Sequence, residues 1–189
     1  MKKFELTTEF ITNFLGTKLF RIKALVEFGK VEKGELGGFV EKEENLDHDG
    51  DAWVSGDAMV YGNARVSGNA EVYGDAEVYG DAEVYGNARV YGDAMVYGNA
   101  RVSGNARVYG NAWVSGNARV SGDAWVSGDA WVSGDAWVSG DQMYAAVKGF
   151  GSEYRNTTFF ITKDGNARVS GNARVYGNAW VSGNARVSG

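Results

Sequence analysis

The sequence predicts an all-β protein, a parallel β-helix with three six-residue units in each coil. The first observation is an internal repeat of fixed period, which is the signature of a repeat architecture. Residues 50–139 are fifteen consecutive copies of the pattern G-[DN]-A-x-V-[SY], and residues 165–188 are four more. The second observation is what varies: Ala and Val are constant in every copy, whereas x is Trp, Met, Arg or Glu.

Each hexad reads as a short strand followed by a corner. Within A-x-V-[SY] the side chains alternate, so Ala and Val share the inner face while x and Ser/Tyr share the outer face. Gly with Asn or Asp then supplies the corner, because these residues tolerate a positive φ. A helix is excluded, since a six-residue period does not keep Ala and Val on one stripe and each glycine would cost about 1 kcal/mol.

Three hexads per coil is the arrangement whose narrow interior small Ala and Val side chains can fill. Fifteen hexads then make five coils, stacked about 4.8 Å apart into a prism about 24 Å long. Residues 18 positions apart stack on the same outer face. A slip by one hexad would keep Ala and Val inside and change only the outer columns, so the sequence leaves the register open.

Residues 1–49 are predicted to form a small β-rich N-terminal cap, which closes the otherwise open end of the repeat block. Alternating apolar residues over residues 19–28 predict a half-buried strand, and a second short strand is expected around Phe39 and Val40. We expect a helical turn over residues 8–14.

The end of the cap resembles the repeats that follow it. The stretch "ENLDHD", residues 44–49, reads as a degenerate hexad in the same frame. This interpretation puts Leu46 at the Ala place and His48 at the Val place.

Residues 140–164 are a non-repeat insertion, and residues 165–189 hold the last four hexads, one coil and a third. The hexad frame does not pass through the insertion, whose 25 residues exceed one 18-residue coil by 7. "TTFFIT", residues 157–162, predicts a strand. Three explanations are open for these last hexads. They fold against the insertion, or this end stacks on another subunit, or the natural C-terminus is altered here.

The repeat resembles the hexapeptide repeat of left-handed parallel β-helices, in which an aliphatic residue is followed four places later by a small one. The stretch from "LFRIKALVEF" to "GDAWVSGDA", residues 19–58, is similar to the opening of the YdcK-like β-helix proteins of enterobacteria and of many phages and prophages. "GFGSEYRNTTFFITKDG", residues 149–165, resembles a segment near the C-terminus of phage members, where a non-repeat domain usually follows. This resemblance implies a left-handed coil and a phage or prophage gene, but no assigned activity.

The outer columns hold the candidate binding residues. The fifth coil carries a Trp on each of its three faces, and Tyr residues stack into a ladder on the coils before it. Three interpretations of these Trp residues are open: they pack against the insertion, they contact a protein partner or a second subunit, or they stack on carbohydrate or another ligand. The residues we single out for binding are Trp113, Trp125, Trp131, Trp137, Tyr73, Tyr91 and Tyr109.

The composition narrows the function classes. The chain has no Cys, so disulfides and Cys-based metal sites are excluded, and no apolar run is long enough to span a membrane. The formal net charge of -5 argues against non-specific nucleic-acid binding, and the 11 acids and 5 arginines of residues 50–139 are too mixed for nucleic-acid mimicry. No signal peptide is recognised, so we expect a location in the cytoplasm of a bacterial host. No cofactor or metal is expected, although Asp57, Asp75 and Asp93 form a column that could hold calcium weakly or cap turns.

An acyltransferase is the alternative function, because enzymes of the hexapeptide-repeat superfamily are acyltransferases and typically use a histidine as general base. The chain has one histidine, His48, with Asp47 and Asp49 beside it. No loop interrupts the fifteen hexads to form a substrate pocket, and we expect His48 to be structural. The hypothesis that the sequence favours is a non-enzymatic scaffold or protein-binding module. It would act on a host protein such as a defence factor, and would self-associate through its faces or its C-terminal end as a homo-oligomer.

Overall fold

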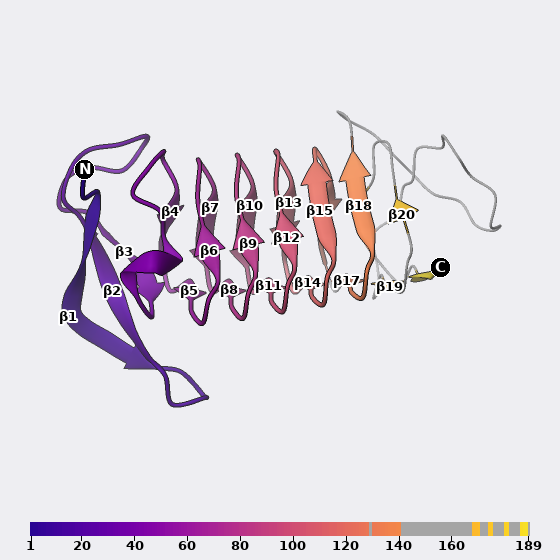
Figure 1. Ribbon diagram of the computed structural model, residues 1–189, viewed down its shortest axis with the longest axis horizontal. Helices are drawn as coiled ribbons and strands as arrows, with labels where there is room; N and C mark the ends of the chain where they lie inside the picture. The colour runs from indigo at the N-terminus through magenta and orange to yellow at the C-terminus, as the bar shows by residue number, and fades with distance from the viewer. Residues whose placement is uncertain (129, 141–167, 171–173, 176–179, 182–185, 189) are drawn as a thin grey trace.

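The computed structural model describes residues 1–128, 130–140, 168–170, 174–175, 180–181 and 186–188. It is an all-β parallel solenoid, whose coils stack along the long axis of the molecule behind an N-terminal hairpin (Figure 1). The predicted fold class is confirmed, while the left-handed sense stays a prediction.

The strands form three sheets, one on each side of the prism. Sheet 1 contains β1 (Phe4–Thr12), β2 (Lys18–Ala24), β3 (Leu36–Val40), β5 (Met59–Val60), β8 (Glu77–Val78), β11 (Met95–Val96), β14 (Trp113–Val114), β17 (Trp131–Val132), β19 (Arg168–Ser170) and β22 (Arg186–Ser188). Sheet 2 contains β4 (Trp53–Val54), β7 (Glu71–Gly74), β10 (Arg89–Gly92), β13 (Arg107–Tyr109), β16 (Trp125–Val126) and β21 (Trp180–Val181). Sheet 3 contains β6 (Arg65–Val66), β9 (Glu83–Val84), β12 (Arg101–Val102), β15 (Arg119–Gly122), β18 (Trp137–Gly140) and β20 (Arg174–Val175).

The predicted 18-residue register is confirmed through the fifteen hexads. Arg89 pairs with Glu71 on one side and with Arg107 on the other, and the same offset holds on all three sheets. Every Ala and Val of these hexads is at most 1% exposed, so they form the continuous core. The corners need glycine: Gly86 has φ +74°, and a Cβ there would lie 3.0 Å from the backbone nitrogen of Gly104.

The strands that follow the insertion continue the solenoid. β19 pairs with β17 on sheet 1, β20 pairs with β18 on sheet 3, and β21 pairs with β16 on sheet 2. After β18 on sheet 3, the next described strand, β19, therefore lies on sheet 1 and not on sheet 2. The place above β16 on sheet 2 is filled by β21, two strands after β19. The strand expected at residues 157–162 lies outside the described residues.

The N-terminal cap is a three-stranded extension of sheet 1. β1 pairs antiparallel with β2, and β2 pairs antiparallel with β3. β3 then pairs parallel with β5, placing Val40 against Val60. The side chains of Phe4 and Ile22 are fully buried in the same cluster as the first Ala and Val residues, so the cap closes the end of the core.

Two of our predictions for the cap are wrong. The helical turn expected over residues 8–14 is the end of β1 and a hairpin turn, because residues 10–12 pair with residues 18–20 of β2. Leu46 lies at the Val place and not at the Ala place, since it bridges to Val66, and His48 falls in the corner that follows. The chain between Leu46 and Val54 is two residues longer than a hexad, which shifts the cap frame relative to the repeats.

Two polar side chains cover the carbonyl groups at the N-terminal end of the solenoid. In the repeats, N–H groups of each coil donate to carbonyls of the next coil, as Trp53 N does to Ala70 O. Because no coil precedes the first one, its equivalent carbonyls need other donors. The Lys3 Nζ donates to the carbonyls of residues 50 and 52, at 3.2 and 2.9 Å. The Asn45 Nδ2 donates to those of residues 62 and 64, at 3.2 and 2.8 Å.

Lys3 is charged and only 3% exposed, so its burial has an electrostatic cost. Burial lowers the pKa of Lys3, while the nearby carboxylates of Asp47, Asp51 and Asp49 act in the opposite direction. The amino group is thus held between backbone carbonyls and an acidic loop, and it satisfies an edge that would otherwise be open to another strand.

Candidate binding surface

The outer faces carry the sequence-predicted aromatic residues in stacked columns. Tyr73, Tyr91 and Tyr109 form one ladder, with ring centroids 4.8 and 4.9 Å apart and planes within 2°. A second ladder of the same kind joins residues 61, 79 and 97. Burial raises the pKa of Tyr73 and of Tyr91. Because each ring covers the face of its neighbour, the ladders present ring edges and hydroxyl groups to solvent.

The four candidate tryptophans lie on three sheets and do not form one cluster. Trp113 and Trp131 are neighbours on sheet 1, with centroids 5.7 Å apart in an edge-on contact. On sheet 2 Trp125 meets the Tyr109 ring at 6.5 Å, and the Arg107 guanidinium lies 4.8 Å from the Trp125 ring centroid. Trp137 lies on sheet 3, where its indole Nε1 donates to the Ser121 hydroxyl at 3.1 Å.

The fifth coil carries one Trp on each face, as predicted, but these side chains differ in exposure. Trp137 is 37% exposed, and Trp113 in the fourth coil is 39% exposed. Trp125 and Trp131 are half-buried, because their neighbours in the preceding coil cover them. The Trp residues of the fifth coil are therefore not equally available to a partner, and Trp137 and Trp113 are the exposed ones among the tryptophans whose side chains the structure describes.

Trp53 begins a column on sheet 2 but is covered by the cap. It is 5% exposed, and the Phe28 ring packs edge-on against it at 5.4 Å. Residues 29–31 and Glu35 line a groove of about 540 Å³ together with Trp53, Tyr73 and Arg89. Trp53 therefore belongs to the cap interface and not to the free outer face.

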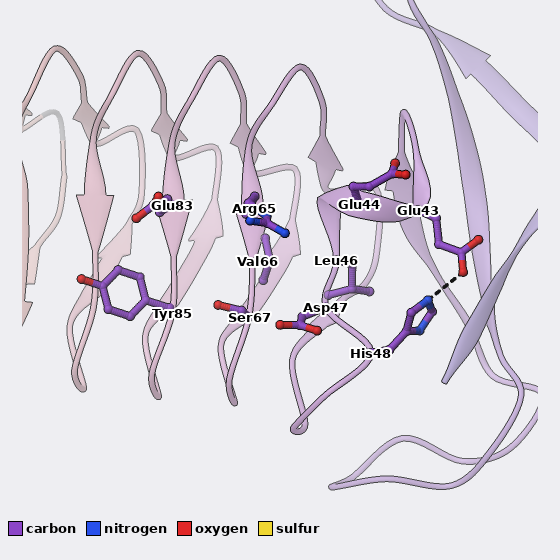
Figure 2. A pocket seen from close by; sticks show the side chains of 10 residues that line it. All are labelled: Glu43, Glu44, Leu46, Asp47, His48, Arg65, Val66, Ser67, Glu83 and Tyr85. Atoms are coloured by element: carbon purple, nitrogen blue, oxygen red, sulfur yellow. Dashed lines mark hydrogen bonds and ion pairs between the residues drawn. The ribbon is translucent and has the colours of Figure 1, made fainter. Parts of the chain in front are cut away.

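A groove of about 620 Å³ lies where the cap meets sheet 3 (Figure 2). The 3₁₀ helix η1 (Glu43–Asn45) and the segment after it form one wall, and the first two strands of sheet 3 form the other. Figure 2 shows the residues that line it: Glu43, Glu44, Leu46, Asp47, His48, Arg65, Val66, Ser67, Glu83 and Tyr85. Four carboxylates against one guanidinium make the groove acidic.

His48 is held at the cap side of this groove by both ring nitrogens. Its Nδ1 accepts the backbone N–H of Lys3 at 3.1 Å, so the ring proton is on Nε2, which lies 2.7 Å from the Glu43 Oε1 (Figure 2). The imidazole stacks on the Phe4 ring at 4.5 Å. Hydrogen bonds from Lys2 and His48 lower the pKa of Glu43. Both nitrogens of the ring are thus used within the fold.

The corners of the prism carry ladders of side-chain hydrogen bonds. Asn69, Asn87 and Asn105 each donate Nδ2 to the Oδ1 of the residue 18 positions later, at 3.1, 3.1 and 2.8 Å. The column of Asp57, Asp75 and Asp93 has acceptors only, so its members cannot bond to one another when ionised. No group of three or more His, Asp or Glu side chains that could hold a metal ion occurs in the described part of the chain.

Replacing Asp75 with asparagine should stabilise the protein. The new Nδ2 would donate to the Asp93 Oδ1, as the Asn63 Nδ2 does to the Asp81 Oδ1 at 3.1 Å, and the two like-charge contacts with Asp57 and Asp93 would disappear. We expect a gain of about 0.2–1 kcal/mol in the free energy of unfolding, measured by urea denaturation. The matched control is Asn69→Asp, which should lower stability by a similar amount. A gain in both variants would contradict the ladder.

Sequence reasoning missed the groove and its lining residues Arg65, Glu83 and Tyr85. The charged outer columns form ion pairs along the faces: Glu83 meets Arg101 at 3.2 Å, and Glu71 meets Arg89 at 3.1 Å. The sequence feature that could have indicated the groove is the spacing between Leu46 and Val54, which is two residues longer than a hexad. This extra length marks the point where the cap and the regular repeats meet.

This architecture defines a class: a parallel β-solenoid of hexad repeats with three sheets, a closed N-terminal end and aromatic or charged outer columns. The YdcK beta solenoid repeat model matches residues 52–68, 60–74, 82–98, 88–104, 100–116, 112–128 and 167–183. These matches extend across residues 52–183, and with the solenoid fold they fit a YdcK-like β-solenoid repeat protein. No curated protein sequence matches it significantly. Within the described residues, no helix is long and apolar enough to cross a membrane.

Proposed function

We propose that the chain is a non-enzymatic β-solenoid scaffold that binds another protein, and that it is encoded by a phage or prophage and acts on a host protein in the bacterial cytoplasm. The observation that carries the proposal is the exposure of Trp137, on the face that also carries Arg119 and Arg101, and of Trp113, on the face that also carries Trp131. Trp, Tyr and Arg are the residues that contribute most binding energy at protein interfaces. The phage and host parts rest on the sequence resemblance.

The rigid outer columns support a role in presenting residues at fixed spacing. The Tyr ladders and the Asn ladders hold side chains in register from coil to coil. A surface that is ordered before binding loses little conformational entropy on association. The same ordering also argues against stacking of sugar rings on the Tyr ladders, because the ring faces already cover one another.

The acyltransferase alternative has less support. Its general base would be His48, whose two nitrogens hold Lys3 and Glu43, and a base needs a nitrogen free to take the substrate proton. We expect no heat of binding when acetyl-CoA is titrated into the full chain in a calorimeter. Binding of acetyl-CoA together with turnover that His48→Ala abolishes would favour the enzyme.

Changing Trp125, Trp131 and Trp137 together to Ser should abolish capture of a host protein. The test compares proteins that the immobilised wild-type chain and the triple variant retain from a bacterial lysate, with bound species identified by mass spectrometry. Met95→Ser, at a half-buried outward position of sheet 1, is the control and should retain the partner. Equal capture by the wild type and the triple variant would contradict a role for these tryptophans in binding.

A further inference from the structure

Among the fifteen hexads, sheet 3 has the most exposed outward side chains of the three faces. Its first outward column is Arg65, Glu83, Arg101, Arg119 and Trp137, and four of these five side chains are exposed. Its second outward column is serine in every coil except the second, which has Tyr85, 38% exposed. Each column thus holds one aromatic side chain: Trp137 follows four charged residues in the first column, and Tyr85 stands among serines in the second.

The two ends of this face are complementary. At the N-terminal end is the acidic groove of about 620 Å³, lined by Arg65, Glu83 and Tyr85 from sheet 3 and by the acids of η1 (Figure 2). Toward the other end are Arg119 and the exposed Trp137. The groove is centred on the first coil, β12 lies in the third coil, and Trp137 lies in the fifth. The groove and Trp137 are therefore each two coils, about 10 Å, from β12.

We propose that two copies of the chain pack face to face through sheet 3, with a two-fold axis along β12 and the solenoid axes antiparallel. This axis brings Arg119 of the second copy against Glu83, and Trp137 of the second copy into the groove beside Arg65. It also places the bulky Tyr85 against the small Ser121 of the second copy. Each contact occurs twice, as in any isologous interface. The inference rests on the proposed function in one respect, since it uses Trp137 as a protein contact.

The charge order selects this orientation. A two-fold axis along the solenoid would put Arg65, Glu83, Arg101 and Arg119 each against its own copy, giving four like-charge contacts. The axis along β12 leaves one such contact, at Arg101, whose Nε is already 3.2 Å from the Glu83 carboxylate of its own chain. Glu83 and Arg119 then face each other with opposite charge, and Arg65 faces Trp137, which sets orientation and suppresses alternatives.

The other two faces do not offer this arrangement. Sheet 2 has the same order of Glu71, Arg89 and Arg107, but residues 29–35 stand beside its first coil and Trp53 is covered. The outward column of sheet 1 has one charged residue within the fifteen hexads, Glu77, which accepts a hydrogen bond from the Tyr61 hydroxyl at 2.9 Å. Sheet 3 is therefore the face with both access and charge complementarity.

The contact area predicts a weak dimer. Five coils at about 4.8 Å and a face about 15 Å wide give about 360 Å² per copy, well below the roughly 800 Å² of a standard interface. We therefore expect dissociation in the micromolar range or above, and we expect it to weaken further as salt screens the charge pairs.

Sedimentation equilibrium of the full chain at low salt, from micromolar to millimolar concentration, tests the arrangement. Glu83→Arg and Arg119→Glu should each weaken dimerisation about tenfold or more, because each sets like charges against each other twice. The double variant should restore it. The matched control is Glu71→Arg, which makes the same change and loses the same kind of ion pair on sheet 2, and should dimerise like the wild type.

A second matched pair tests the aromatic contact. Trp137→Ser should weaken dimerisation about tenfold or more, whereas Trp113→Ser, of similar exposure on sheet 1, should not. Circular dichroism confirms that each variant folds. A wild-type chain that stays monomeric at millimolar concentration overturns this inference, and so does a dimer insensitive to both charge swaps. Neither outcome bears on capture of a host protein, which tests the proposed function separately.

Discussion

Replacing Lys3 with methionine and Asn45 with leucine should together lower the free energy of unfolding by about 2–6 kcal/mol. Each substitution keeps the approximate size of the side chain and removes the donor from two carbonyls of the first coil, one of them buried. A buried acceptor left without a partner costs about 1–3 kcal/mol, and the two sites act on different sheets. Urea denaturation of the two single variants and the double variant measures the effect.

The control is Lys2→Met, because Lys2 is next in sequence and its ammonium pairs at 3.0 Å with the exposed Glu43 carboxylate. An exposed ion pair contributes about 0–1 kcal/mol, so this variant should resemble the wild type. A second consequence follows for Lys3→Met and Asn45→Leu. With carbonyls unpaired, the end of the solenoid becomes a template for another strand, and light scattering should detect association. Equal stability of Lys2→Met and Lys3→Met would show that the buried amino group contributes nothing.

The repeat block could be predicted from the sequence because every rule it obeys is local. Alternation in A-x-V-[SY] places Val90 inside and Arg89 outside, and glycine at the corner allows a positive φ. Once three strands close a coil, the 18-residue register follows, and it brings Glu71 against Arg89. The ambiguity of a one-hexad slip is removed by the cap, since Val40 pairs with Val60 and fixes where the first coil begins.

The cap could not be predicted at the same level, because its structure depends on contacts between residues distant in sequence. Residues 10–12 are extended because they pair with β2, although the local sequence also allows a helical turn. Leu46 takes the Val place because the Asn45 amide bonds to two carbonyls of the first coil. His48 then leaves the core and meets Phe4, which is 44 positions earlier in the sequence.

The candidate surface was predictable in its columns and not in its exposure. The sequence places Trp125, Trp131 and Trp137 on three different faces, and the strand pairing confirms this. How much of each indole remains exposed depends on the preceding coil. Trp113 packs edge-on against Trp131, whereas the preceding coil places Arg119 and the small Ser121 beside Trp137. The groove on sheet 3 depends on how η1 meets the prism, and no single repeat contains that information.

The largest loss of stability is expected from a polar group in the core. Val90 is fully buried in β10, between Val72 and Val108. Val90→Thr keeps the shape and buries a hydroxyl, which should cost about 1–3 kcal/mol. Val90→Asp buries a carboxyl and should cost more than about 4 kcal/mol at neutral pH, a large part of the 5–15 kcal/mol typical of a domain. Thermal and urea unfolding measure both variants.

The two variants should differ in how their loss depends on pH. Burial raises the pKa of an aspartate in the folded state above its value of about 3.9 in the unfolded chain. Below that value both states bind the proton, and the Val90→Asp loss is smallest. As pH rises above about 3.9, the carboxyl ionises first in the unfolded chain, so the stability lost in Val90→Asp relative to the wild type grows. The stability lost in Val90→Thr stays constant with pH. Ser103→Asp, on the outer face beside β12, should stay within about 0.5 kcal/mol of the wild type throughout. A Val90→Asp loss that does not change with pH would mean that the carboxylate reaches water, which a close-packed interior of Ala and Val does not allow.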